Sequence, residues 1–486
     1  KLAVGGVGGG GSNIDWTMIK KLDLPNCGLT TLPSNLPQAV PNLSILFCPK
    51  NKFVEVPAVI GKCPKLQMIS FKECHTITSI HPDALQSQLR WLILTGNLIN
   101  EIPTTISRCT KLQKWMLSGN RLTQLPSSTT LSSLTNLELV RLACNQLVEP
   151  PLSLLKLPNL RWAAFASNPF LTKTSSDNER SSKSSSSLEI FDDLTLEDTT
   201  TWPVLGQGAG GVTRKVTWTR KEQTTQDSGD DNASSSTTTI DVAVKIYAGE
   251  LTSDGSPQDE KAIAVQAATM FPDEPALIKI YGETKRMGGL VMEFLEDFKA
   301  LAGPPSFDTC SRDVYDTTTT TTSLLTPTFC WIIATSMLRV LNKLHSIGIC
   351  HCDFYAHNIL IRPSTHDVKL SDFGAAFRYD RTSSSTTETS VTANNDDEDP
   401  QTQPAAKDEP RTESYGQYIE RIELRSYTVL VQELYDNYII SPKIKQTTDG
   451  DDNDIGVDEN DQWTLLLDAC KRDDASFASV AEQFVV

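Results

Sequence analysis

Residues 112–126 read L-Q-K-W-M-L-S-G-N-R-L-T-Q-L-P, and this stretch decides the fold of the N-terminal part of the chain. Its apolar residues, Asn and Pro follow the pattern L-x-x-L-x-L-x-x-N-x-L-x-x-L-P, which recurs from Ile19 to Phe170. Successive copies are 24, 23, 23, 23, 25 and 23 residues apart. The Asn position, sometimes filled by Cys, falls at Cys27, Asn51, Cys74, Asn97, Asn120, Asn145 and Asn168.

This periodicity resembles that of leucine-rich repeats, whose units have about 20–29 residues. Each unit would form one short strand with inward leucines, and because no unit can bury that face alone, neighbouring units must stack. We expect the buried Asn to bond backbone groups at the turn after the strand, with Cys as a partial substitute. An array of amphipathic helices would not have Asn or Cys and Pro at these regular positions. The sequence therefore predicts about seven repeats at 18–171, after a Gly-rich segment at 1–17.

The strand positions on either side of the inward leucines should face the concave side of the solenoid. Nine of these fourteen residues are apolar or aromatic, and an exposed apolar patch of this extent usually marks an interaction surface. We therefore predict a protein partner on the concave face, and the C-terminal domain of this same chain is one candidate. The two columns are Lys21, Ile45, Met68, Trp91, Lys114, Leu139 and Trp162, and Asp23, Phe47, Ser70, Ile93, Met116, Arg141 and Ala164.

The composition limits the classes of partner. The chain has 486 residues, with 44 Lys and Arg against 60 Asp and Glu, which gives a net charge of −16. Its length suggests about two to four domains. The acidic balance argues against a nucleic-acid binder that neutralises phosphates and against a basic membrane-surface protein.

The cysteine pattern indicates a reducing compartment, and the hydropathy argues against a membrane span. Eleven cysteines are scattered without a C-x-x-C pair, which favours free thiols over a disulfide framework. No stretch reaches the roughly 18 uncharged apolar residues that a membrane span needs. We expect a cytoplasmic protein, and Lys1 in place of an initiator Met indicates a fragment.

The composition changes after Phe170. Residues 172–187 are rich in Ser, Thr, Lys and Asp, from which a packed core cannot be built. We interpret 172–200 as a flexible linker. Residues 201–486 then form a second domain, interrupted by low-complexity surface insertions at 221–239, 303–327, 381–414 and 446–461.

Five motifs follow one another in this second domain. They are G-x-G-x-x-G from Gly206, V-A-V-K ending at Lys245, a helical run containing Glu260, H-C-D-F-Y-A-H-N from His351, and D-F-G from Asp372. The glycine motif alone is a weak signal, since dinucleotide-binding folds share it. Those folds need a helix directly after the glycines, whereas residues 212–218 have the pattern of a strand.

The ordered set resembles the protein kinase signature, and the similarity extends over about 205–486. It is similar to the tyrosine-kinase-like group. The resemblance implies an α/β multidomain chain in which a leucine-rich-repeat solenoid is followed by a two-lobed, protein-kinase-like α+β domain.

The resemblance also implies roles for the motif residues, with ATP and Mg²⁺ as cofactors and a protein as substrate. Lys245, held by Glu260, would pair with the α- and β-phosphates, and Asp353 would orient the substrate hydroxyl. Asn358 and Asp372 would hold Mg²⁺, which prefers hard oxygen ligands. The nucleotide-binding positions are Leu205, Gly206, Gly208, Gly211, Lys245, Met292, Glu293, Phe294 and Leu295.

The catalytic loop departs from the family pattern. Cys352 replaces the usual Arg, Tyr355 replaces the usual Lys, and Glu423 replaces the Asp that anchors the loop from a central helix. His357 is a candidate surrogate cation, and the alternative that it only fills space in the fold is favoured.

A zinc site competes for part of this segment, because Cys and His side chains crowd it. The finger spacing is missing, and His351 is better explained as a core residue behind Phe373. The crowded residues are His345, Cys350, His351, Cys352 and His357.

Two functions remain open. The first is an ATP-dependent protein kinase that acts on Ser or Thr hydroxyls, with the repeats recognising a protein partner. The second is a pseudokinase scaffold that binds nucleotide or partners without catalysis. The complete motif set favours the enzyme, and the substituted catalytic loop favours the scaffold.

Overall fold

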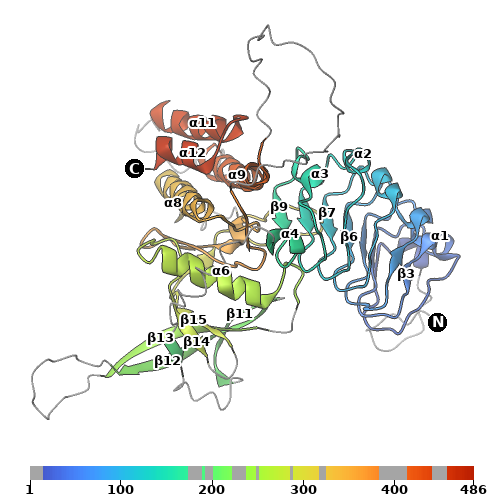
Figure 1. Ribbon diagram of the computed structural model, residues 1–486, viewed down its shortest axis with the longest axis horizontal. Coiled ribbons are helices and arrows are strands. Elements are labelled where there is room, and N and C mark those ends of the chain that lie inside the picture. The colour runs from blue at the N-terminus through green and yellow to red at the C-terminus, as the bar shows by residue number, and fades with distance from the viewer. Residues whose placement is uncertain are drawn as a thin grey trace, which may run out of the picture.

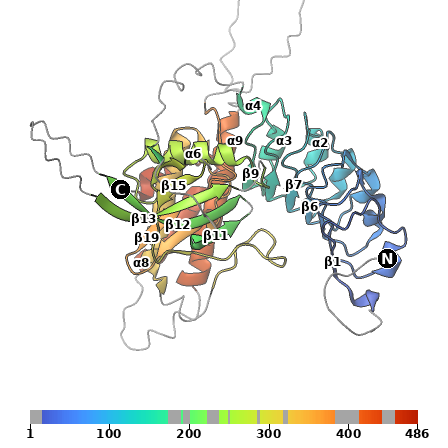
Figure 2. The ribbon, with the colours of Figure 1, turned by 90° about the horizontal axis from the view of Figure 1, so that it is seen from below.

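The computed structural model of the chain describes residues 15–172, 189–191, 201–208, 210–221, 237–247, 251–284, 288–316, 324–381, 413–440 and 457–485. A curved solenoid of repeats lies beside a two-lobed domain, and the contact involves the last repeats, near β9 and α4 (Figures 1 and 2). Among the described residues, no helix has both the length and the apolar composition that crossing a membrane requires.

Seven parallel strands form the concave sheet of the solenoid, in chain order. The register pairs Trp91 with Lys114 and Ile93 with Met116, so the two predicted concave columns are confirmed. The strands are β1 (Lys21–Asp23), β2 (Ile45–Phe47), β4 (Met68–Ser70), β6 (Trp91–Ile93), β7 (Lys114–Met116), β8 (Leu139–Arg141) and β9 (Trp162–Ala164). A second small sheet joins β3 (Glu55–Val56) and β5 (Ser79–Ile80).

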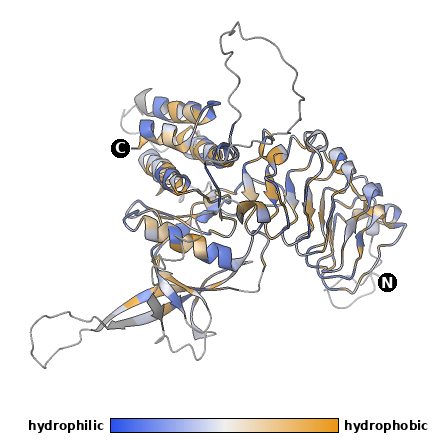
Figure 3. Ribbon diagram, in the orientation of Figure 1, coloured by the Kyte–Doolittle hydropathy of each residue, from blue (hydrophilic) through white to orange (hydrophobic). Residues whose placement is uncertain are grey.

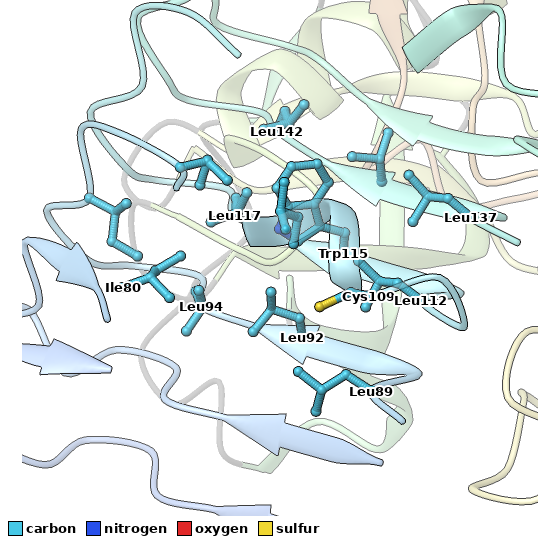
Figure 4. Packing of buried hydrophobic residues seen from close by; sticks show 14 of the residues in the cluster. Ile80, Leu89, Leu92, Leu94, Cys109, Leu112, Trp115, Leu117, Leu137 and Leu142 are labelled. Atoms are coloured by element: carbon cyan, nitrogen blue, oxygen red, sulfur yellow. The ribbon is translucent and has the colours of Figure 1, made fainter. Parts of the chain in front are cut away.

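Short helical turns cover the convex side and enclose the apolar core. Leu92, Leu112, Leu117 and Trp115 come from successive strands and turns and point toward one another (Figure 4), and all four are fully buried. The turns are α1 (Leu36–Ala39), α2 (Ser128–Leu131), α3 (Leu152–Leu155), α4 (Pro169–Thr172) and 3₁₀ turns at Trp16–Met18, Ala58–Lys62, Pro82–Ala84 and Thr104–Arg108.

A ladder of buried asparagines links each repeat to the one before it. In Asn120, Nδ2 donates to the carbonyls of Leu94 (3.0 Å) and Leu117 (2.8 Å), while Oδ1 accepts from the N–H of Ile99 (3.0 Å). Cys74, at the equivalent position, gives one long sulfur bond to Cys48 O at 3.6 Å. The predicted role of the Asn column is confirmed.

Replacing Asn120 by Ala should lower the free energy of unfolding by about 1–3 kcal/mol, because the buried N–H of Ile99 loses its acceptor. The carbonyls of Leu94 and Leu117 lose one of their two Asn donors and keep Asn97 and Asn145. Urea denaturation followed by Trp fluorescence measures this. The matched control is Asn136→Ala, an exposed Asn with one bond to Thr110 O, which should change stability by about 0.5 kcal/mol or less. Equal effects of both variants would contradict the role given to the ladder.

The N-terminal lobe is a six-stranded sheet with one long helix, α6 (Pro257–Met270). Its edge strand β10 (Glu189–Phe191) pairs in parallel with β14. The sequence predicts a flexible linker over 172–200, and for these three residues that prediction is wrong. The other strands are β11 (Val204–Gly208), β12 (Gly211–Lys221), β13 (Thr237–Tyr247), β14 (Ile280–Thr284) and β15 (Leu290–Glu293).

The C-terminal lobe is built on four helices. Thr326 caps α8 (Pro327–Ser346) by accepting from Phe329 N, and Ser414 with Gln417 forms a capping box on α9 (Tyr415–Leu434). Hydrophobic and hydrophilic residues interleave along these helices, as one buried face requires (Figure 3). Helices α11 (Val457–Lys471) and α12 (Phe477–Phe484) complete the lobe, with strands β16 (Lys299–Ala300), β17 (Ile349–Cys350), β18 (Ile359–Arg362), β19 (Asp367–Leu370) and β20 (Phe377–Arg378).

One predicted surface insertion is partly buried. The sequence assigns 303–327 to low-complexity surface, yet Cys310, Ser311 and Asp313 are buried. The segment 303–316 lies against the concave face, where the Phe307 ring is 5.7 Å from that of Trp91. Within this prediction, residues 317–323, which include the Thr run, fall outside the described residues.

The core of the repeats continues into the C-terminal lobe. The ring of Phe165 lies 5.6 Å from that of Phe377, and Phe170 lies 5.9 Å from Tyr415. Ile419 and Ile422 of α9 belong to the same buried cluster as the repeat leucines. The two parts of the chain therefore share one apolar core.

Candidate active site

A cavity of about 540 Å³ separates the two lobes. The sequence-predicted nucleotide-binding residues all line it, together with Glu260 and Asp372. Asp353 and Asn358 are not among the described residues that line it. The predicted binding positions brought together here are Leu205, Gly206, Gly208, Gly211, Lys245, Met292, Glu293, Phe294 and Leu295.

The glycine loop folds over this cavity as a hairpin of β11 and β12. Gly211 has a φ of +147°, and a Cβ there would meet Ile246 O at 2.1 Å, so no other residue fits. A Cβ on Gly206 or Gly208 would meet nothing within 4 Å. At these two positions the missing side chain leaves room for a ligand beside the backbone.

Lys245 on β13 pairs with Glu260 on α6, and its Nζ lies 3.9 Å from Oδ1 of Asp372. Burial by itself lowers the pKa of Lys245, but Asp372 and Glu260 hold it above its ordinary value. Burial raises the pKa of Glu260 against the lowering effect of Lys245, with Asp372 adding to the rise. The cavity thus contains more carboxylates than cations.

Asp254 adds to this negative charge and was missed by the sequence analysis. It lies in the segment between β13 and α6, lines the cavity with Thr252, and has its pKa raised by burial and by Asp353 and Asp372 despite Arg141. In the sequence, only the position of Asp254 between Lys245 and Glu260 indicates that it lies near the site. An excess of carboxylates around one Lys suits a divalent cation, which would neutralise them.

The catalytic loop brings Asp353 and Asn358 together. Asn358 Nδ2 donates to the main-chain O (2.9 Å) and to Oδ2 (3.0 Å) of Asp353, which leaves its Oδ1 as the atom that a metal would take. Burial raises the pKa of Asp353, but the charges of Arg141 and His357 hold it below its ordinary value. Asp353 is therefore ionised near neutral pH.

The substituted positions of the loop have partners in the structure. Tyr355 lies parallel to Trp162 of the repeats, with ring centroids 4.2 Å apart. His357 Nδ1 bonds Oδ1 of Asp313 at 2.7 Å, and although burial lowers the pKa of His357, this bond raises it overall. Arg141 of β8 forms an ion pair with the Asp353 carboxylate.

The crowded Cys and His residues form a bonded cluster. Glu423 Oε2 bonds His345 Nε2 (2.7 Å) and accepts from His351 N (3.1 Å), and Oε1 accepts from Cys352 N (2.5 Å). His345, Cys350 and Glu423 are close enough to share a metal. However, His345 Nε2 is already hydrogen-bonded to Glu423, and burial raises the pKa of the Cys350 thiol well above its usual range, which disfavours the thiolate that a metal would bind. These two observations favour a structural role for the cluster over a metal site. The His351 ring lies 5.0 Å from that of Phe373, which confirms the predicted packing.

Comparisons with known proteins agree with the motif set. Residues 240–395 match the family described as protein kinase domain. A stretch of 44 residues is 52% identical to the glycogen synthase kinase-3 homolog YGK3 of Saccharomyces cerevisiae, covering 9% of this chain and 12% of that protein. The chain thus matches about an eighth of the length of this curated relative.

Two solved structures resemble the chain weakly. An internalin of Listeria monocytogenes shares 18% identity at a TM-score of 0.26, over 31% of this chain and 42% of that one. A leucine-rich-repeat protein of Leptospira interrogans shares 20% identity at a TM-score of 0.24, over 32% of this chain and 50% of that one. The repeat fold therefore rests on the strand register and the Asn ladder described above.

Proposed function

We propose that this chain, which joins leucine-rich repeats to a protein kinase domain, transfers the γ-phosphate of ATP to a Ser or Thr hydroxyl of a protein. The observation that carries the proposal is the pairing of Lys245 with Glu260 beside Asp372 in one cavity. Asp353 and Asn358 lie together on the catalytic loop. Protein kinase domains in general use ATP and a divalent metal.

Each residue has a role in the reaction. Lys245, fixed by Glu260, binds the α- and β-phosphates. The substrate hydroxyl oxygen bonds to the γ-phosphorus while the bond to the ADP oxygen breaks, and the hydroxyl proton passes to Asp353. Asn358 and Asp372 would hold Mg²⁺, which supplies charge neutralisation to the phosphates.

The adenine ring would lie between the lobes. Met292 at the end of β15 lines the back of the cavity, and the backbone at Glu293 to Leu295 would read the adenine edge. Leu205 would cover the ring from the glycine loop. The Glu293 side chain points to another partner, since its Oε1 accepts a hydrogen bond from Lys279 N at 2.8 Å.

The test is phosphotransfer from radiolabelled ATP with Mg²⁺, measured on the full chain and on a protein substrate. Asp372→Ala and Lys245→Met should each lower the rate by about 10²-fold or more. Lys245 places a positive charge at the phosphates, and Asp372 would hold the Mg²⁺ that neutralises them. Lys245→Met should also weaken ATP binding.

Lys261→Met is the matched control, because Lys261 lies on α6 and pairs with Glu283 instead of lining the cavity. It should retain the wild-type rate. An Asp372→Ala protein that labels its substrate as fast as the wild type would show the assignment to be wrong.

A pseudokinase scaffold is the second candidate. It is favoured by Cys352 and Tyr355 in place of the usual Arg and Lys, and by the low exposure of the Asp353 side chain, 16%. Under this function the chain would bind ATP with normal dependence on Lys245, yet none of its variants would transfer phosphate.

We also infer that the concave face of the repeats recognises a protein partner at the end that the kinase domain leaves exposed. Lys21 and Asp23 of β1 are exposed there, while Leu139 and Trp162 further along are covered by the kinase domain. A partner that needs the whole concave face would compete with that domain.

A further inference from the structure

The repeats cover the catalytic loop through contacts with Cys352, Phe354 and Tyr355. Trp162 Nε1 donates to Phe354 O at 2.9 Å, and the Trp162 ring stacks on Tyr355 with an interplanar angle of 7°. Ala163 N donates to Cys352 O at 3.2 Å. Tyr355, which replaces the usual catalytic-loop Lys, is consequently 5% exposed.

Arg141 occupies the position beside the catalytic carboxylate. Its guanidinium forms an ion pair with Oδ1 of Asp353, lies 2.9 Å from Oδ1 of Asp254, and donates to Cys352 O at 3.3 Å. Because Oδ2 of Asp353 already accepts from Asn358, both carboxylate oxygens are engaged. The Arg141 side chain is 3% exposed, so this contact is desolvated.

Two loops of the kinase domain extend the contact on either side. In the segment between β13 and α6, Ser253 O accepts from Ser118 Oγ at 2.7 Å. In segment 303–316, Ser311 and Arg312 bond Glu138, and Phe307 packs on Phe47 and Trp91. The contact therefore spans the concave strands from β2 to β9 and involves both lobes.

We propose that the concave face acts as an intramolecular pseudosubstrate, in which Arg141 holds the place that a protein hydroxyl must take at Asp353. Transfer to a protein then requires the repeats to leave the catalytic loop. This inference rests on the proposed kinase function and adds its regulation. It predicts that the closed chain still binds ATP, since none of the residues lining the nucleotide cavity of about 540 Å³ comes from the repeats.

Arg141 could instead supply the cation that Tyr355 fails to provide. That role would need a path by which the substrate hydroxyl reaches a free oxygen of Asp353. With Arg141 and Asn358 on the two oxygens and Trp162 over Tyr355, the docked repeats leave only 16% of the Asp353 side chain exposed, which restricts this path. The two roles predict opposite effects of removing Arg141.

The decisive variant is Arg141→Glu in the full chain, which places a negative charge against Asp353 and Asp254. Its kcat/KM for a protein substrate should rise about tenfold or more, because like charges at the desolvated contact would make the repeats dissociate from the catalytic loop. Its affinity for ATP should stay within about threefold, because Arg141 does not line the nucleotide cavity. Arg121→Ala is the matched control, since Arg121 is exposed and lies outside the concave strands, after the end of β7 at Met116. It should behave as the wild type.

Phe307→Ala is a second variant that should not disturb folding, because Phe307 is 42% exposed. It removes the ring contacts with Phe47 and Trp91 and should raise kcat/KM by a smaller factor, about two- to fivefold. Hydrogen exchange of the amides at 352–358 should be faster in both variants, which reports on opening independently of phosphotransfer.

A reversible disulfide between the repeats and the kinase domain tests whether their separation causes the gain in activity. A Cβ on Gly255 would lie 3.7 Å from that of Ala166, within the range for a disulfide. In an Arg141→Glu chain that also carries Gly255→Cys and Ala166→Cys, oxidation should abolish the gain in activity and reduction should restore it. The Arg141→Glu chain alone should be insensitive to the reductant.

The outcomes separate the inference from the function it rests on. If the wild type transfers phosphate as fast as Arg141→Glu, or if that variant is slower, the pseudosubstrate is wrong and the kinase function stands. Hydrogen exchange can show that the repeats have left the catalytic loop in the Arg141→Glu chain, and a titration can show that this chain binds ATP. If both hold and it still transfers no phosphate, the kinase function fails and the inhibitory role fails with it.

Discussion

Asp353→Asn is expected to lower the rate of phosphotransfer by about 10²–10⁴-fold, the usual contribution of a positioned general base. The amide keeps the shape of the carboxylate but cannot take the hydroxyl proton. ATP affinity should be nearly unchanged, because Asp353 is not among the residues that line the nucleotide cavity. The measurement is a single-turnover assay on the full chain beside an equilibrium ATP titration.

This substitution has a useful second effect. It removes the ion pair with Arg141, so a loss of activity cannot be attributed to tighter docking of the repeats. Asp367→Asn is the control, since Asp367 pairs with Arg362 on the hairpin of β18 and β19. If Asp353→Asn retains the wild-type rate, Asp353 does not act as the base.

Glu423→Ala should lower the free energy of unfolding by about 3–5 kcal/mol, as expected when one member of a buried charged network is removed. Glu423 is fully buried on α9 and satisfies His345 and two N–H groups of the catalytic loop. Chemical denaturation at pH 7 measures the change. Glu482→Ala, at an exposed position of α12, should stay within about 0.5 kcal/mol of the wild type.

The pH dependence of the same group has a definite sign. Burial raises the pKa of Glu423, but the bond to His345 and the charges of His345 and His351 hold it below its ordinary value. Its stabilising contribution is therefore present above the unfolded pKa of about 4.3 and lost as pH falls through the folded pKa. Glu423→Gln should flatten the stability curve below about pH 4.3, and an unchanged curve would contradict this account.

The repeats and the motif order could be predicted from the sequence because both are local patterns. The 23-residue spacing that fixes Asn97 and Asn120 also fixes the strand register. The residue types at Lys245 and Asp372 are similarly dictated by the chemistry of phosphate and metal. The pairing of Glu423 with the catalytic loop followed from one recognisable helix.

The docking of the repeats could not be predicted to the same degree. The concave columns indicated an interaction surface, but the contact of Arg141 with Asp353 joins positions 212 residues apart, for which no periodicity exists. Segment 303–316 was assigned to the surface because its composition is polar, and tertiary contact with Phe47 and Trp91 overrides that signal. The strand β10 was missed because three residues give too short a pattern against Ser-rich flanks.

The core shared by Phe165, Phe377, Phe170 and Tyr415 has a consequence for any attempt to divide the chain. A polypeptide that starts after the linker would expose Phe377, Tyr415, Ile419 and Ile422 to water, and contiguous apolar surface of this kind promotes aggregation. A polypeptide that stops at the linker would leave Phe165 uncovered. Cloning boundaries drawn in the Ser-rich segment should therefore yield two poorly soluble halves, and heating the intact chain should give a single melting transition shared by repeats and kinase domain.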